Sequence, residues 1–216
     1  NPRTYLSSNI IGTYNVIEIA HKIKAKHLLL ASSSSIYGAN KKSPYRETDN
    51  VRNQLSIYAS TKLATESLAH AYANIWNLPI TAIRFFTVYG PWGRPDMALF
   101  KFTKAILDKK PIDVFNHGKH TRDFTYIDDI VEGMIKSLDN PAIINSNWNS
   151  DQPDPATSKA PWRIYNIGNN KPVHLMDYLD ALQKTLGKKA KINFLPLQPG
   201  DVPDTYANVD NLRMKF

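Results

Sequence analysis

The chain has 216 residues, 42% of them apolar and 21% charged, a composition typical of a folded protein of one or two domains and not of a disordered one. It has no cysteine, which excludes a disulfide framework, and no apolar run approaches the ~18 residues needed to span a bilayer. The net charge of +8 is compatible with an anionic partner, either a nucleic acid or a small molecule.

The first half of the chain shows alternating helix and strand patterns, which are typical of an α/β fold. In chain order we expect helix 3–23, strand 27–33, a loop over 38–55, helix 56–76 and strand 80–86. The apolar start of strand 27–33 favours a parallel strand covered by helices on both faces. Gly12 lies inside the first helix at a cost of roughly 1 kcal/mol relative to alanine, so we expect another backbone to approach it. Pro79 is expected to end the second helix.

The second half of the chain is less regular. Four glycine and proline residues between Tyr89 and Asp96 indicate a loop that leaves the sheet. Beyond this loop we expect helix 98–109, strand 111–115, a strand and a helix over 121–139, a long loop over 140–162, strand 163–167, helix 175–186 ending at Gly187, strand 191–195 and a loop over 196–204. Trp148 and Trp162 are expected to pin the long loop.

Tyr58 and Lys62 stand four residues apart in the second predicted helix, so their side chains project from one face. A tyrosine titrates near ~10 in isolation, and a neighbouring ammonium favours its phenolate form. Ser33 lies at the end of the preceding strand, where its hydroxyl can share the proton that Tyr58 moves. A lone Tyr-x-x-x-Lys pattern is also compatible with a solvated helix face, but together with the strand-end serines it predicts a proton-transfer site for an alcohol.

Four longer motifs extend this pattern along the chain: residues 8–13, 84–97, 121–129 and 198–202, which read SNIIGT, RFFTVYGPWGRPDM, TRDFTYIDD and QPGDV. With these motifs the chain resembles the extended short-chain dehydrogenase/reductase family, and within it the nucleotide-sugar epimerases. The nearest resemblance is to the UDP-glucuronate 4-epimerases of bacterial polysaccharide synthesis.

The resemblance implies a Rossmann-like α/β fold, a parallel sheet with helices on both faces, joined to a smaller α+β substrate domain. Residues 1–88 and 121–169 would belong to the Rossmann domain, and 89–120 and 170–216 to the substrate part. The family's Gly-x-x-Gly-x-x-Gly turn, which lets a backbone approach a pyrophosphate, is absent from the sequence. We therefore expect an internal fragment of a longer protein whose N-terminal Rossmann part is missing. The family habit further implies a homodimer through helices 3–23 and 56–76.

The resemblance assigns NAD as the cofactor, Tyr58 as the catalytic base, Lys62 as the group that lowers its pKa and binds the nicotinamide ribose, and Ser33 as the catalytic hydroxyl. Asn9 and Phe86 match positions that contact the cofactor, although Asn9 could equally be a buried structural amide. Further matches concern the substrate, and they are Ser34, Ser35, Thr87, Arg94, Phe115, Arg122 and Asp201.

These substrate positions have distinct implied roles. Thr87 would lie near the sugar and Phe115 near the uracil, while Arg122 would hold the diphosphate, since its planar fork matches phosphate oxygens. An ion pair of Arg122 with Asp123 or a neighbour is the alternative. Asp201 would lie near the nucleotide, although some relatives have arginine where this chain has Gln198, which removes one phosphate contact.

Substrate choice depends on a few side chains. Arg94, Thr87, Ser34 and Ser35 are the candidates for meeting the carboxylate of a uronic acid. The 4,6-dehydratases have an Asp-Glu pair at the positions of Ser34 and Ser35, and two hydroxyls cannot replace that acid and base at neutral pH.

The sequence and the resemblance thus predict a cytoplasmic, NAD-dependent 4-epimerase that acts on a UDP-sugar through a 4-keto intermediate, with UDP-glucuronate as the expected substrate. A decarboxylase or dehydratase on the same scaffold, or a non-catalytic nucleotide-binding scaffold, is the alternative. The basic residues are dispersed and not interleaved with aromatic ones, so nucleic acid is not the expected partner. The six histidines show no ligand spacing, so no metal is expected.

Overall fold

The computed structural model describes residues 1–198 and 200–216. Pro199, which belongs to the QPGDV motif, lies outside the described residues. The larger part of the molecule is built on a parallel sheet of β1 (Leu28–Ser33), β2 (Ile80–Phe85) and β6 (Trp162–Ile167), with β2 in the centre. The predicted parallel α/β crossover is confirmed.

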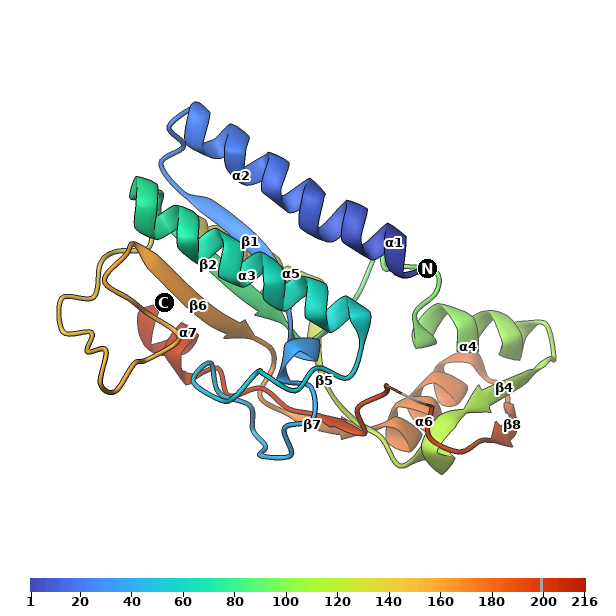
Figure 1. Cartoon of the computed structure of the whole chain (residues 1–216). Coiled ribbons are helices and arrows are strands. Elements are labelled where there is room, and N and C mark those ends of the chain that lie inside the picture. Colours follow the sequence, from blue (N-terminus) through green and yellow to red (C-terminus); the bar gives the residue numbers. More distant parts are fainter. Residues whose placement is uncertain (199) are drawn as a thin grey trace.

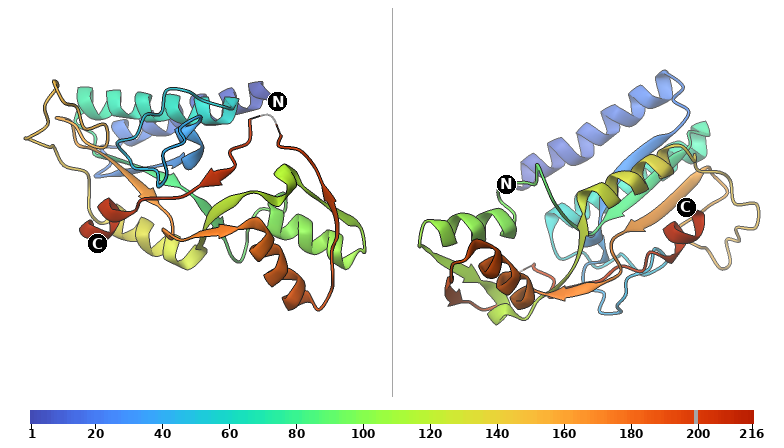
Figure 2. Two further views of the ribbon diagram at one scale, coloured as in Figure 1. Left: turned by 90° about the horizontal axis from the view of Figure 1, so that it is seen from below. Right: turned by 180° about the vertical axis from the view of Figure 1, so that it is seen from behind.

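Helices cover both faces of this sheet, as Figures 1 and 2 show. One face carries α2 (Gly12–Lys22) and α3 (Ile57–Trp76), and the other carries α5 (Ile127–Leu138) and the short α7 (Asp210–Lys215). The core beneath α2 and α3 is formed by buried apolar residues of both layers, including Ile17, Ala69, Tyr72, Ile80, Trp162 and Ile164. A second cluster, Ile83, Ile130 and Ile167, packs α5 onto the opposite face.

A smaller layer lies beside this sheet (Figure 1). Here β4 (Pro111–Val114) pairs in parallel with β8 (Lys191–Phe194), and α4 (Ala98–Leu107) and α6 (Leu175–Leu186) pack against the pair through Ile106, Ile112, Val114 and Leu179. A connecting sheet of β3 (Thr87–Tyr89), β5 (Thr121–Tyr126), β7 (Pro172–His174) and β9 (Asp204–Thr205) links the two parts. The predicted α/β fold with a smaller α+β part is observed.

The first predicted helix is not uniformly α-helical. It consists of α1 (Pro2–Tyr5), a π-helical segment (Leu6–Ile11) and α2, in one continuous rod. The expectation that a backbone approaches Gly12 is wrong, because among the described residues a Cβ at this position would meet only the carbonyl oxygen of Ser7, at 3.8 Å. Gly12 instead follows the π-helical segment directly.

Several other element boundaries differ from the predictions. Helix α3 begins after Ser56, whose hydroxyl accepts a hydrogen bond from Ala59 N at 3.1 Å, and it ends at Asn77 in a left-handed conformation, before Pro79 is reached. The predicted loop from Tyr89 follows the short strand β3, and β7, β9 and α7 were not expected. Helix α4 ends at Leu107, two residues before the predicted end.

The long loop between α5 and β6 is pinned as expected. The Trp148 indole donates a hydrogen bond to the carbonyl oxygen of Asp154 at 3.0 Å, and Trp162 is 2% exposed in the core with Ala156 and Ala160. Within the part of the chain that the structure describes, none of the helices combines the length and apolar character required to cross a membrane.

Candidate active site

A cavity of about 610 Å³ opens where β1 and β2 end, and we call it the strand-end cavity. Tyr58, Lys62 and Ser33 all line it, although α3 supplies the first two and β1 the third. The carboxyl ends of parallel strands are where α/β folds bind their ligands. The structure therefore brings the three predicted catalytic residues to one space.

The Lys62 ammonium donates a hydrogen bond of 2.9 Å to the carbonyl oxygen of Ala31, two residues before the end of β1. Burial lowers the pKa of Lys62 from its usual value. The Tyr58 ring lies 5.7 Å from the ring of Tyr5, which also lines the cavity. Among the described residues no hydrogen bond joins the Tyr58 hydroxyl to Lys62 or Ser33. Catalytic groups often lack such hydrogen bonds in a structure without substrate and form them when substrate binds.

Ser33 begins a single 3₁₀-helical turn, Ser34–Tyr37. Its hydroxyl oxygen accepts a hydrogen bond from Ser35 N at 3.1 Å, so its own hydrogen remains available for donation. Ser34 and Ser35 line both the strand-end cavity and a second space of about 230 Å³, which we call the junction cavity.

A buried polar network lies beneath these serines, and it was not predicted. Glu66, on α3, accepts two hydrogen bonds from the Arg84 guanidinium, Nε to Oε1 at 3.0 Å and NH2 to Oε2 at 2.9 Å, and a third from the hydroxyl of Ser32. Arg84 NH1 also donates to the Tyr37 hydroxyl and to the carbonyl oxygen of Glu47, both at 3.1 Å. The network ties the end of β1 to α3 and β2, and so holds Ser33 relative to Tyr58.

The Tyr37 phenol extends this network to β6. Its hydroxyl donates to Asn166 Oδ1 at 2.6 Å, and burial raises the pKa of Tyr37 to about 12, which keeps the phenol a donor. An arginine inside the otherwise apolar strand 80–86 was the signal in the sequence, since a buried charge requires a partner. The partner could not be identified without the packing of α3 on β2.

The two predicted cofactor contacts outside the catalytic trio differ in their placement. Asn9 donates a hydrogen bond of 2.9 Å to the hydroxyl of Thr61 on α3 and is not among the residues that line the strand-end cavity. This placement favours the alternative interpretation of Asn9 as a structural amide. Phe86 lines the cavity, with its ring packed near those of Tyr37 and Tyr45.

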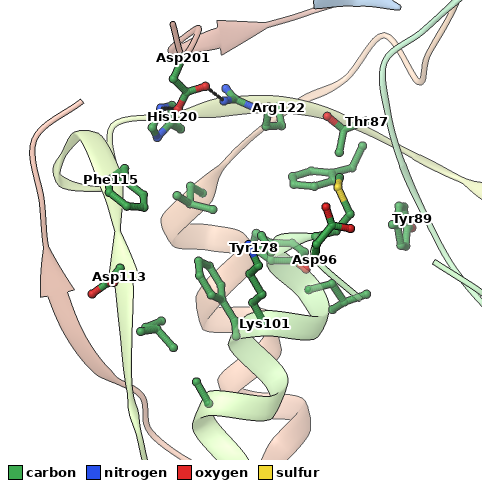
Figure 3. A pocket seen from close by; sticks show the side chains of 18 of the residues that line it. Thr87, Tyr89, Asp96, Lys101, Asp113, Phe115, His120, Arg122, Tyr178 and Asp201 are labelled. Carbon is green, nitrogen blue, oxygen red and sulfur yellow. Dashed lines mark hydrogen bonds and ion pairs between the residues drawn. The ribbon is translucent and has the colours of Figure 1, made fainter. Parts of the chain in front are cut away.

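Arg122 and Asp201 form an ion pair between the junction cavity and a third, largely apolar cavity of about 670 Å³, and they line both (Figure 3). Arg122 NH2 lies 3.3 Å from Asp201 Oδ1, and its NH1 donates to the carbonyl oxygen of Pro203 at 2.6 Å. The alternative partner Asp123 is fully buried and instead accepts backbone hydrogen bonds from Asn169, Asn170 and Ala207. Thr87 lines all three cavities, so they adjoin one another at this residue.

The apolar cavity lies between β4, α4 and α6, and Phe115 lines it (Figure 3). Gln198 is another of its lining residues. Tyr178 and Phe124 stack on its wall with ring centroids 4.9 Å apart. Burial raises the pKa of Tyr178 to about 12. An apolar space lined by aromatic rings suits an aromatic base, and the Arg122–Asp201 pair lies at one end of it (Figure 3).

Arg94 lies on the loop after β3 and lines the strand-end cavity. Its exposed guanidinium is held by Asp96 in a bidentate pair, with distances of 2.9 and 3.0 Å. Arg94, which was predicted to bind the carboxylate of the sugar, therefore lies at the cavity but is already paired with Asp96.

Comparison with known proteins connects this geometry to a family. The profile of the NAD dependent epimerase/dehydratase family matches residues 1–180. Protein CapI of Staphylococcus aureus is 55% identical over 98% of this chain and 64% of its own length. A probable UDP-glucuronate 4-epimerase of Rhizobium meliloti is 47% identical over 98% of this chain and 62% of its own length. The chain thus spans less than two thirds of these relatives.

A solved structure shows the same fold. The UDP-glucuronic acid 4-epimerase of Bacillus cereus, in complex with UDP-glucuronic acid and NAD, superimposes with a TM-score of 0.81 at 32% identity, covering 97% of this chain and 61% of the other. The matched profile, the relatives and the shared fold agree, and the chain belongs to the NAD dependent epimerase/dehydratase family.

Proposed function

We propose that the chain carries the proton-transfer and sugar-nucleotide sites of an NAD-dependent 4-epimerase that interconverts UDP-glucuronate and UDP-galacturonate. The observation that carries the proposal is the convergence of Tyr58, Lys62 and Ser33 on one cavity, which shares Thr87 as a lining residue with the cavity that Arg122 lines. Relatives named as UDP-glucuronate 4-epimerases and a structure with UDP-glucuronic acid and NAD support it. In this proposal residues 1–88 and 121–169 form the dinucleotide-binding part, and 89–120 and 170–216 the substrate part.

The side chains of the strand-end cavity fit the nicotinamide end of NAD. Lys62 offers a half-buried ammonium, Tyr58 and Ser33 offer hydroxyls that suit the ribose, and Phe86 adds an aromatic wall. When bound, NAD supplies the hydride acceptor and donor at C4 of the sugar.

Tyr58 acts in this site as the general base. Lys62 projects from the same face of α3, and the Tyr58 oxygen removes the proton of the C4 hydroxyl as the sugar is oxidised. Ser33 donates its free hydroxyl hydrogen toward the same oxygen, since its lone pair already caps the 3₁₀ turn. Tyr58 returns the proton when the 4-keto sugar, turned over in the site, is reduced on its other face.

Substrate is held at the other end of the connected cavities. Arg122 binds the diphosphate and Phe115 packs on the uracil in the apolar cavity, with Asp201 beside them. The sugar carboxylate is bound by hydroxyl groups, those of Ser34, Ser35 and Thr87. Arg94 is less suited to this role, because it is paired with Asp96 and would have to break that pair to bind the carboxylate. Two serines where a dehydratase has an acid and a base favour epimerisation over elimination.

The test uses the full-length protein with NAD and UDP-glucuronate, followed by NMR. We expect UDP-galacturonate without release of carbon dioxide, and a loss of activity of about 10²–10⁴-fold in Tyr58→Phe, the range for general acid–base catalysis. Tyr72→Phe, the same substitution on the same helix at a residue that bonds Glu18, is the matched control. Release of carbon dioxide would identify a decarboxylase, and formation of a 4-keto-6-deoxy sugar would identify a dehydratase. Binding of the substrate without turnover would identify a non-catalytic scaffold.

The proposal includes a cytoplasmic homodimer formed through helices 3–23 and 56–76. Apolar side chains exposed on α2 and at the end of α3, among them Val16, Ile19, Ile75 and Trp76, support this interface, since burying them would release water from apolar surface. Light scattering after size exclusion measures the mass. A monomer at micromolar concentration would contradict the interface.

A further inference from the structure

His120 is a buried histidine that none of the roles above uses. It directly precedes β5, is 4% exposed, and lines the apolar cavity. Its backbone carbonyl accepts a hydrogen bond from Leu175 N at 2.9 Å, which fixes it to the start of α6. Figure 3 shows its imidazole beside Asp201 at the end of the cavity where Arg122 lies.

The His120 imidazole competes with Arg122 for one carboxylate. His120 Nε2 lies 3.1 Å from Asp201 Oδ2, while Asp201 Oδ1 faces Arg122 NH2 at 3.3 Å and accepts a 2.9 Å bond from Val202 N. The contact of Nε2 with Asp201 lacks hydrogen-bond alignment, and among the described residues Nε2 has no other partner. Asp201 is therefore not bound firmly by either side chain.

A diphosphate at Arg122 would change this balance. Phosphate oxygens compete with Asp201 for the guanidinium, and a planar fork prefers two phosphate oxygens over one long contact to a carboxylate. Asp201 would then face new negative charge, and among the described residues the His120 imidazole, 3.1 Å away, is the side chain left to hold it. An imidazolium is the group that can keep it in place.

We propose that His120 is a positioning residue that takes up a proton when a diphosphate binds Arg122, and that its charged form then holds Asp201. The proposal rests on the proposed nucleotide site. Neutral His120 leaves Asp201 on Arg122 when the site is empty, and charged His120 removes Asp201 from Arg122 when the site is filled. Nucleotide binding is thereby linked to proton uptake at His120.

The charges around His120 support this direction. Burial, and next the positive charge of Arg122, lower the pKa of His120, whereas Asp201 raises it. Neutralising Arg122 with a diphosphate removes one lowering influence, so the pKa rises on binding. The remaining charged and titratable groups nearby, Asp204 and Tyr45, act on Arg122.

Calorimetric titration of the full-length protein with UDP-glucose tests the linkage. The diphosphate of this probe is esterified at both ends and does not titrate near neutrality. Runs at pH 7 in buffers of different ionisation enthalpy give the number of protons taken up. We expect net uptake, approaching one proton, and an affinity that increases as the pH falls from 8 to 6, at most tenfold per pH unit.

Variants separate the proposal from its basis. His120→Gln should abolish the uptake and flatten the pH profile while UDP-glucose still binds, and Asp201→Asn should do the same should the first variant fail to fold. His174→Gln is the matched control, since this histidine lies 3.4 Å from Thr121 on the neighbouring strand. It should leave the proton uptake and the pH dependence of the affinity unchanged. Binding without uptake, or uptake that persists in His120→Gln and Asp201→Asn, overturns the role of His120. No binding of UDP-glucose overturns the proposed nucleotide site itself.

Discussion

Replacing either member of the buried Arg84–Glu66 pair should reveal how strongly the network beneath the strand-end serines is coupled. Both side chains are almost fully buried, at 2% and 5% exposure. Glu66→Met leaves the Arg84 charge without its partner, and Arg84→Met does the same to Glu66. Removing one member of a buried pair costs about 3–5 kcal/mol, because the other charge stays desolvated.

The double variant should be much less destabilised than the sum of the two. With both charges replaced by methionine no buried charge remains, and such apolar replacements are often close to neutral. The hydroxyls of Ser32 and Tyr37 and the carbonyl of Glu47 still lose a partner, at about 1 kcal/mol each. We therefore expect about 2–3 kcal/mol for the double variant against about 6–10 kcal/mol for the sum.

Urea denaturation measures these free energies when fluorescence and far-UV circular dichroism give the same transition. A folded chain has only about 5–15 kcal/mol in total, so the single variants should unfold at much lower urea than the double variant. Single-variant losses that add to the double-variant loss within about 0.5 kcal/mol would refute the coupling. A double variant that is stable but inactive would separate the positioning of Ser33 from stability.

Three further changes test other parts of the structure. Asp123→Ala should lower the free energy of unfolding by at least about 3 kcal/mol, since three backbone N–H groups lose a charged acceptor, and a change in urea midpoint equivalent to less than 1 kcal/mol would contradict this. Gly38→Ala should destabilise the protein more than Gly187→Ala. Both glycines have positive φ, at 55° and 61°, which costs about 1–2 kcal/mol for alanine, but at Gly38 the new Cβ would also lie 2.2 Å from the carbonyl oxygen of Asn53. Equal melting temperatures of the two variants would rule out this clash. Burial lowers the pKa of His27, and a backbone hydrogen bond opposes this, so the unfolded chain binds the proton first as the pH falls below about 6.5. The free energy of unfolding should therefore decrease toward acid pH, and His27→Gln should reduce this decrease between about pH 7.5 and 5.5. An unchanged decrease in the variant would assign the pH dependence to other groups.

The long elements could be predicted because their signals are local. Helix 56–76 has a capping serine, an amphipathic stretch and a proline beyond its end, and strand 80–86 is a continuous β-rich run. The strands β3, β7 and β9 have two or three residues each and no periodicity of their own. They exist because β5 offers them an edge, and pairing across that distance leaves no local pattern.

The site residues also differ in whether local sequence or long-range packing brings them together. Tyr58, Lys62 and Ser33 are recognisable because one helix and the strand before it carry them at fixed spacing. His120 and Asp201 are 81 positions apart and meet only because β5 and the segment before β9 run side by side. Arg94 illustrates a further limit, since its pairing with Asp96 depends on the conformation of a loop and not on residue type.

The π-helical segment Leu6–Ile11 allows one rod to serve two partners at once. A π turn contains more residues than an α turn, so it changes the angular phase between the parts of the helix on either side of it. Tyr5 and Asn9 can therefore face α3, while Ile17 is set independently toward the sheet. Deleting one residue from this segment would restore a regular α-helix with both contact sets kept, because the π turn takes up one extra residue in the same full rotation, whereas inserting a residue elsewhere in the rod would rotate one contact set by about 100°.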